Sequence, residues 1–218
     1  MFTGIVEEVG RVAAVQPLEE GREITIAAAR VLEDLAVGDS INVDGACQTV
    51  VARSAETFSV QAVRSTLGRT TLGGFEPGRP VNLERSMPAS GRFGGHWVQG
   101  HVDGVGEVRS VRPAGETVFL TVRLPEAVRD AVVLHGSIAI DGVSLTIHAL
   151  PAEGEAEIAL IPYTYAETNL ARLAPGDRVN VEGDLVCKYV FQWLSKLRAA
   201  DPALPARRPA GNRSEAEN

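Results

Sequence analysis

The chain has 218 residues, of which 44% are hydrophobic, so it is long enough for one or two domains with substantial cores. Its formal net charge of −7 argues against non-specific binding to nucleic acid, which depends on neutralising phosphates with Lys and Arg. The two cysteines have no Cys-x-x-Cys spacing, which indicates neither a disulfide framework nor a zinc site.

The opening residues lack the charged and apolar regions of an export signal. No apolar run approaches the roughly 20 residues that a membrane-spanning helix needs. We therefore expect a soluble, cytoplasmic protein that binds neither membranes nor nucleic acid.

Short alternating segments separated by turn residues dominate the first half of the chain. Strands are expected at residues 4–15, 22–28, 40–43, 47–53, 57–62 and 80–85. Residues 31–35 read as a short apolar turn, and residues 66–72 are expected to turn helically with Thr66 as the cap. Strand signals at about 8–12-residue spacing are typical of an all-β barrel or sandwich.

The second half of the chain repeats this plan. Strands are expected at residues 100–111, 117–123, 137–140, 144–149, 155–161 and 178–182, with a short helix at 126–131. Residues 86–95 are rich in Gly, Ser and Pro and read as a linker. Because barrel closure removes exposed strand edges, each half is predicted to form a barrel of about six antiparallel strands.

The C-terminal region departs from the strand pattern. Val186, Val190, Trp193 and Leu197 recur at spacings of four, three and four, which predicts a helix over residues 186–198 with Asp184 at its N-cap position. A single helix of about 13 residues is marginal alone, so it should pack on a barrel or on copies of itself. Residues 199–218 have no period and are expected to be disordered.

A duplication explains the repeated plan. Motifs recur in the same order at spacings of 96, 97 and 98 residues: Gly4 with Gly100, Cys47 with Ser144, Thr49 with Thr146, and Thr66 with Thr164. A unit of roughly 95 residues is longer than solenoid repeats and large enough to fold as a domain. We predict two similar domains, residues 1–95 and 96–185, followed by the helix and the tail.

Each copy carries a polar pair on a predicted strand. Residues i and i+2 of an extended chain lie on one face, so Cys47 points the same way as Thr49, and Ser144 the same way as Thr146. Two small hydrogen-bonding side chains beside a glycine suit a flat polar ligand that approaches the backbone closely. Taken alone, Cys47 fits equally well as a small buried hydrophobic residue. Ser144 and Thr146 taken alone fit equally well as ordinary polar residues of a β-strand.

Four motifs lie in register on the duplicated scaffold: Met1-Phe2-Thr3-Gly4-Ile5-Val6-Glu7, Gly45-Ala46-Cys47-Gln48-Thr49-Val50, Gly94-Gly95-His96 followed by Gly100-His101-Val102-Asp103-Gly104, and Ile140-Asp141-Gly142-Val143-Ser144-Leu145-Thr146. Together they make the chain resemble the riboflavin synthase family of the alpha-chain type, from residue 1 to about residue 196. The resemblance implies an all-β fold of two similar six-stranded antiparallel Greek-key barrels with a C-terminal trimerisation helix.

The same resemblance implies a transferase. Two molecules of 6,7-dimethyl-8-ribityllumazine would give riboflavin and 5-amino-6-ribitylaminouracil by transfer of a four-carbon unit, the last step of riboflavin biosynthesis. One lumazine would bind each barrel, and the working site would form between two subunits of a homotrimer. The lumazine ring itself delocalises the reacting anion, so no metal or organic cofactor is expected. Association with lumazine synthase stays open, as does a non-catalytic lumazine- or flavin-binding carrier or optical protein of the same fold.

The family's functional positions transfer to two pockets. The catalytic candidates are His101, Ser144, Cys47 and Thr146. The N-terminal pocket would use Thr3, Gly4, Ile5, Val6, Ser40, Cys47, Gln48, Thr49, Gln61, Ala62, Val63, Arg64, Ser65 and Thr66. The C-terminal pocket would use Gly100, His101, Val102, His135, Ser144, Leu145, Thr146, Leu160, Ile161, Pro162, Tyr163, Thr164, Tyr165 and Asp184.

Several residues near these motifs have simpler interpretations. His96 is expected to be structural, because five residues along a strand place it on the face opposite to His101, which also disfavours the two as metal ligands. Asp184 is explained equally well as a helix cap. The Asp-Gly pairs at residues 44–45 and 141–142 are interpreted as hairpin turns.

The chain also departs from the family pattern. Ser65 stands where the family usually has Glu, and His135 where Lys is common. Residues 163–166 replace a more usual His-Thr-Leu-Glu run. These differences put individual ligand contacts in doubt while leaving Cys47, His101 and Ser144 in place.

Overall fold

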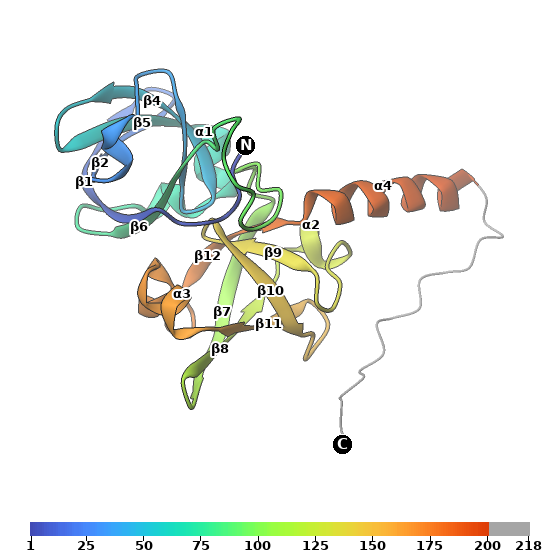
Figure 1. Cartoon of the computed structure of the whole chain (residues 1–218). Coiled ribbons are helices and arrows are strands. Elements are labelled where there is room, and N and C mark those ends of the chain that lie inside the picture. Colours follow the sequence, from blue (N-terminus) through green and yellow to red (C-terminus); the bar gives the residue numbers. More distant parts are fainter. Residues whose placement is uncertain (201–218) are drawn as a thin grey trace.

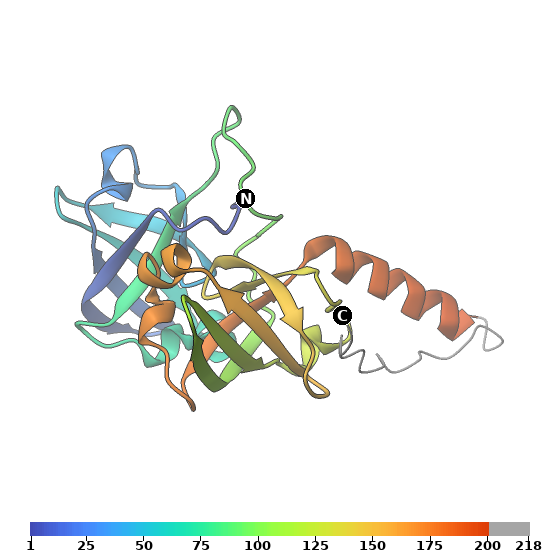
Figure 2. The same cartoon turned by 60° about the horizontal axis from the view of Figure 1, so that its bottom comes forward.

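Two closed barrels of six antiparallel strands each, with a C-terminal helix, form the structure, a computed structural model that describes residues 1–200 (Figure 1). The predicted fold class is confirmed. Helix α4 (Leu185–Ala200) projects away from both barrels in Figures 1 and 2. It ends two residues later than expected, and residues 201–218 of the predicted disordered tail lie outside the described residues.

The first barrel closes in the strand order β1-β2-β5-β4-β3-β6. Its strands are β1 (Glu8–Leu18), β2 (Gly21–Ala27), β3 (Ser40–Val43), β4 (Ala46–Arg53), β5 (Thr57–Val63) and β6 (Pro80–Arg85). Short helical turns connect them: η1 (Val31–Glu33), α1 (Arg64–Arg69) and η2 (Thr71–Gly74). Thr66 lies inside α1, whose N-cap Val63 makes no side-chain cap, and Thr70 caps the following turn η2, where its hydroxyl accepts a hydrogen bond from the Leu72 N–H.

The second barrel repeats this order of strands. Its strands are β7 (Gly104–Ala114), β8 (Thr117–Arg123), β9 (Ser137–Ile140), β10 (Val143–Ala149), β11 (Glu155–Leu160) and β12 (Arg178–Gly183). Its helical turns are α2 (Glu126–Arg129), α3 (Pro162–Ala166) and η3 (Asn169–Arg172). Strand β7 begins four residues later than predicted, because Gly100 takes a left-handed conformation with φ of +76° and interrupts the extended chain.

The segments before the first strand of each barrel cross to the other barrel. Val102 is buried in the core of the first barrel, and Val6 packs against the core of the second. Phe2 and Val98 exchange backbone hydrogen bonds of 2.8 and 3.2 Å on this crossing, and both side chains are buried there with Ala139. The two barrels are therefore joined by exchanged chain as well as by surface contact.

The two Asp-Gly turns meet at the contact between the barrels. Asp44 and Asp141 have φ of +45° and +44°, as expected for hairpin turns. Gly45 and Gly142 are so close that a Cβ on Gly45 would lie 2.9 Å from the Gly142 nitrogen. The hairpin interpretation is correct, and the structure adds that these turns form part of the interface between the barrels.

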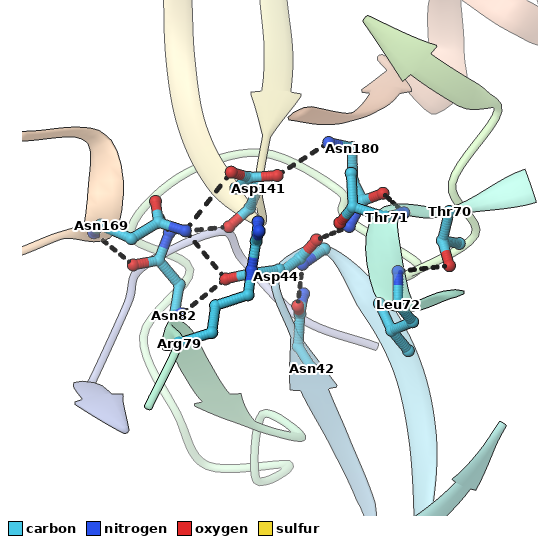
Figure 3. Close-up of polar contacts among 11 residues, drawn as sticks. Asn42, Asp44, Thr70, Thr71, Leu72, Arg79, Asn82, Asp141, Asn169 and Asn180 are labelled. Carbon is cyan, nitrogen blue, oxygen red and sulfur yellow. Dashed lines mark hydrogen bonds and ion pairs between the residues drawn. The ribbon is translucent and has the colours of Figure 1, made fainter. Parts of the chain in front are cut away.

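Around these turns lies a buried polar network, shown in Figure 3. Asp44 Oδ1 accepts hydrogen bonds from the Asn82 N–H at 2.7 Å and from Asn169 Nδ2 at 3.0 Å. Asp141 accepts one from the Asn180 N–H at 2.7 Å and a longer one from Asn169 Nδ2 at 3.3 Å. Asn82 and Asn180 each donate to the backbone carbonyl of the aspartate in the other barrel. Buried polar groups of this kind fix orientation, because any other arrangement leaves them unpaired.

The two aspartates are fully buried and share one amide donor, which makes the stability of the chain sensitive to pH. Burial raises the pKa of Asp141 from its ordinary value of 3.8 to about 7. Burial and the nearby Asp141 carboxylate also raise the pKa of Asp44. The charge of Asp177 adds to the rise in the pKa of Asp141, and the positive charge of Arg79 lowers the pKa of both aspartates in part. The folded chain therefore holds protons that the unfolded chain releases, and stability is lost as pH rises from about 4 towards 7.

Replacing Asp141 with Asn should remove much of this pH dependence. Asn tolerates the left-handed backbone and keeps an oxygen for the Asn180 N–H. We expect the free energy of unfolding of the wild-type chain to fall between pH 5 and pH 8 by roughly 1–4 kcal/mol more than that of Asp141→Asn. Urea unfolding at both pH values measures this, with the exposed Glu116→Gln as a charge-matched control. An Asp141→Asn variant with wild-type pH dependence would contradict the assignment.

Candidate functional site

The two polar pairs lie on the outer faces of the barrels. In β4 the side chains of Ala46, Gln48 and Val50 are buried, whereas Cys47 is half-buried and Thr49 exposed. Strand β10 has the same alternation, with Ser144 half-buried and Thr146 exposed. Each pair shares one face, as predicted from the strand period.

Each pair is bordered by the segment that belongs, in sequence, to the other barrel. The Cys47 N–H donates a hydrogen bond of 2.8 Å to the carbonyl of Gly100. The Ser144 N–H donates one of 2.7 Å to the carbonyl of Gly4. The structure thus places Gly4 beside Ser144 of the second barrel and Gly100 beside Cys47 of the first, whereas the grouping from the sequence assigned Gly4 to the Cys47 pocket and Gly100 to the Ser144 pocket.

Only glycine fits at these two crossing points. Gly4 and Gly100 both have φ of +76°, a conformation that other residues adopt at a cost. A Cβ on Gly4 would lie 2.6 Å from the Ser144 Cβ, and one on Gly100 would lie 2.6 Å from the Cys47 Cβ. The absence of a side chain lets each buried glycine turn lie directly against Cys47 or Ser144.

Two buried glutamates hold these turns in place. Glu84 accepts hydrogen bonds from the Thr3 N–H at 2.7 Å, the Thr3 hydroxyl at 3.0 Å and the Gly4 N–H at 3.0 Å. Glu182 accepts one of 2.8 Å from the Gln99 N–H. Burial raises the pKa of both carboxyls, while these backbone donors lower it. Neither glutamate is among the site residues predicted from the sequence, although the repeated Val-Asn-x-Glu at residues 81–84 and 179–182 marks them.

A cavity of about 230 Å³ lies beside Cys47 in the first barrel. It brings together predicted residues from β4, from α1 and from the crossing segment: Cys47, Gln48, Ser65, Thr66, Gly100, His101 and Val102. Burial raises the pKa of the Cys47 thiol, and the Ser40 hydroxyl and the Met1 ammonium oppose this only in part. The thiol is therefore protonated at neutral pH and can act as a weak hydrogen-bond donor rather than as a thiolate.

Ser144 in the second barrel has a partner that was not expected. His96 Nδ1 lies 2.7 Å from Ser144 Oγ, and the His96 ring is buried. His96 and His101 do not lie on opposite faces of one strand, because residues 99–103 form no strand and residues 94–98 only a single bridge. Burial lowers the pKa of His96, against the nearby Asp184 carboxylate, so the imidazole is neutral and can accept the serine proton.

The structure thus separates the catalytic candidates into two groups. His101 lines the Cys47 cavity, and His96 contacts Ser144. Thr146 lies exposed next to Ser144 on β10. Each barrel therefore carries a polar strand residue with an imidazole nearby.

The predicted site residues differ in how exposed their side chains are. Those exposed at the surface are Ile5, Thr49, Gln61, Val63, Arg64, Ser65, His101, His135, Thr146, Ile161, Pro162 and Tyr163. Those half-buried are Val6, Ser40, Cys47, Thr66, Ser144, Thr164, Tyr165 and Asp184. Those buried are Thr3, Gly4, Gln48, Ala62, Gly100, Val102, Leu145 and Leu160. Ala62, Leu145 and Leu160 belong to the barrel cores, so only their backbone groups can face a ligand.

Asp184 does cap the C-terminal helix. Its Oδ1 accepts hydrogen bonds from the Val186 N–H at 2.8 Å and the Cys187 N–H at 3.0 Å. Among residues 1–200 no three His, Cys, Asp or Glu side chains converge on a point that could hold a metal ion. Over the same residues no helix is long and apolar enough to cross a membrane.

Known proteins match this arrangement over most of its length. The lumazine binding domain family matches twice, at residues 3–86 and 99–184. The riboflavin synthase of Actinobacillus pleuropneumoniae is 43% identical over 202 residues, which cover 93% of this chain and 94% of that protein. The riboflavin synthase of Bacillus subtilis is 40% identical over 196 residues, which cover 90% of this chain and 91% of that protein.

Solved structures of a similar fold hold ligands. The structure of LumP complexed with riboflavin has a TM-score of 0.78 at 26% identity, covering 84% of this chain and 99% of LumP. The structure of LumP complexed with 6,7-dimethyl-8-(1'-D-ribityl) lumazine has a TM-score of 0.76 at 25% identity, with the same coverage.

Proposed function

Because this chain belongs to the riboflavin synthase family of duplicated lumazine-binding domains, we propose that it converts two molecules of 6,7-dimethyl-8-ribityllumazine into riboflavin and 5-amino-6-ribitylaminouracil. One lumazine donates a four-carbon unit to the other, so the two products together contain all the atoms of the two substrates. Binding of lumazine and riboflavin by LumP supports this choice of ligand.

The observation that carries the proposal is the pair of equivalent half-sites. A glycine turn from the other barrel meets Cys47 in the first barrel and Ser144 in the second. Two similar surfaces suit two copies of one heterocycle. Holding both rings in reacting orientation removes translational and rotational entropy, which contributes on the order of 7–11 kcal/mol.

Within this proposal Ser144 acts on the lumazine ring through its hydroxyl. His96 Nδ1 lies 2.7 Å from Ser144 Oγ, and in the tautomer with the proton on Nε2 it accepts the hydroxyl hydrogen bond. In this role His96 is a positioning residue that makes Ser144 a better nucleophile or activator of water. Cys47 remains a protonated donor to the second ring, with His101 beside it. We assign the other predicted residues of both surfaces to binding the rings and their ribityl chains.

Assembly into a homotrimer is a further part of the proposal. Helix α4 exposes Val186, Val190, Trp193 and Leu197 along one stripe. Its first turns are tied to the second barrel by the Lys188–Asp103 ion pair at 3.0 Å, and the rest of the helix projects outward (Figures 1 and 2). An isolated helix with this much exposed apolar surface needs a partner. Trimer contacts along this stripe would bring the first barrel of one subunit to face the second barrel of its neighbour.

The test is incubation of the purified chain with the lumazine, followed by fluorescence of riboflavin and chromatography of the pyrimidine. We expect both products in equal amounts. Tight binding of the lumazine without either product would favour a carrier that resembles LumP in its ligands.

Replacing Ser144 with Ala should lower turnover about 100-fold with little change in melting temperature, because it removes a hydroxyl that acts in the transition state. Replacing His96 with Gln should also lower turnover, and should change the acidic side of the kcat–pH profile, which the imidazole controls. His148→Gln, at an exposed position on β10, is the matched control. Loss of melting temperature in proportion to activity would indicate a structural role.

A further inference from the structure

A second and larger cavity, of about 670 Å³, lies between the two barrels. Its walls come from α1 and η2 of the first barrel and from η3 and β12 of the second. The volume falls in the range of about 300–1,000 Å³ that is usual for small-molecule sites. None of the residues proposed to bind the lumazine lines it, so it is distinct from both half-sites.

The charged residues of this cavity are mainly cationic. Three arginines line it, Arg79, Arg172 and Arg178, against one carboxylate, Asp177. Within residues 1–200 neither Arg172 nor Arg178 forms an ion pair or a side-chain hydrogen bond. Asp177 Oδ2 accepts a hydrogen bond of 2.8 Å from the Ala174 N–H, and the carboxylate offsets part of the positive charge. Because Arg79 lies near Asp44, the positive charge of this cavity in a chain of net charge −7 comes mainly from Arg172 and Arg178.

Buried polar atoms without partners also border this cavity. Thr71 is 7% exposed, and its hydroxyl has no hydrogen-bond partner. Arg79 Nε is likewise buried and unpaired. Arg79 Nη2 lies 3.9 Å from Asp44 Oδ2, which is an ion-pair distance but too long for a hydrogen bond (Figure 3). The Thr71 hydroxyl and Arg79 Nε have almost no accessible surface, so a ligand in the cavity would instead meet the exposed part of the Arg79 side chain, which is 35% exposed.

We propose that the cavity between the barrels binds a small oxyanion, either inorganic phosphate or a phosphate monoester. Arg79 provides a guanidinium on the side of the first barrel. Arg172 and Arg178 provide guanidinium forks for the outer oxygens, the geometry that suits phosphate. A ligand in this place would contact both barrels at once.

The cavity is adjacent to the Cys47 half-site. Thr70 lines both cavities, and Ser65, Thr66 and Arg69 of α1 face the smaller one while Leu67 and Gly68 face the larger. An anion bound between the barrels would therefore contact the same short segment that borders the substrate surface. Any effect of the anion on lumazine affinity must be matched by an equal effect of lumazine on anion affinity.

Isothermal titration calorimetry of the full chain with inorganic phosphate and with glycerol 3-phosphate, at constant ionic strength, tests the proposal. We expect saturable binding of at least one of them. Tighter binding of the ester would assign an organic phosphate, and tighter binding of inorganic phosphate would assign the free ion. Absence of saturable binding for both would overturn the proposal.

Variants locate the site. Arg172→Gln should weaken binding about tenfold, since it removes a charge-assisted contact. Gly74→Leu should abolish binding, because the position lines the cavity, has no left-handed backbone, and has no atom within 4 Å of a built Cβ. Arg123→Gln, at an exposed position on β8, removes the same charge elsewhere and should bind as the wild type does. Unchanged binding by Arg172→Gln and Gly74→Leu would refute the assignment.

Discussion

Removal of residues 186–218 is expected to leave a monomer that converts the lumazine at least a hundredfold more slowly than the full chain. The physical reason is that the proposed working site needs two barrels from different subunits. Within one chain the two half-sites lie on different barrels, beside Cys47 on β4 and beside Ser144 on β10, and the proposal does not bring them to face each other. Loss of preorganisation between two reactants is worth several orders of magnitude in rate. Light scattering gives the mass of the particle, and riboflavin fluorescence gives the rate.

Point variants test the exposed apolar stripe of α4 without removing the helix. Val190 and Trp193 are 53% and 64% exposed, so replacing both with Glu should leave α4 folded while placing charge in the proposed contact. Gln192→Glu adds a charge at the neighbouring exposed position outside this stripe and should remain assembled. A fully active monomer would contradict both the trimer and the composite site.

Replacing Gly100 with Ala is expected to destabilise the chain by about 3 kcal/mol and to abolish most of the activity. The added Cβ would lie 2.6 Å from the Cys47 Cβ, so the crossing segment must move away from the strand. The left-handed φ of +76° adds backbone strain, and overpacking together with such strain costs roughly 2–5 kcal/mol. Gly4→Ala should have the same effect at Ser144, where the built Cβ is equally close.

Gly78→Ala is the matched control for this pair of variants. Gly78 has φ of +93°, but no atom lies within 4 Å of a Cβ built there, so its replacement isolates the cost of the backbone conformation. We expect it to lose only about 1–2 kcal/mol and to keep its activity. Urea unfolding compares the variants, and a Gly100→Ala variant no less stable than Gly78→Ala would show that the crossing is looser than the contact distances indicate.

Much of the fold could be predicted because its signals are local. The strand period, the Asp-Gly turns and the repeat at spacings of 96–98 residues predict two similar barrels, and strands such as β3 and β8 were located to the residue. The placement of Cys47 and Ser144 on outer strand faces follows from the same period. Residues 99–103 form no strand, so the alternation of faces does not apply there, and the predicted placement of His96 opposite to His101 is wrong.

The amino-acid sequence by itself determined the duplication, because the motifs recur in order along the chain. It also determined the strands of the barrels and the polar strand residues, because each depends on neighbours within a few positions. Only the tertiary structure decided which segments meet. Gly100 adjoins Cys47, His96 reaches Ser144 across 48 residues, and Asn180 donates to the carbonyl of Asp44 across 136. No local pattern records such contacts, since they arise when two closed barrels pack and exchange their leading segments, and the backbone groups buried by that packing must find partners.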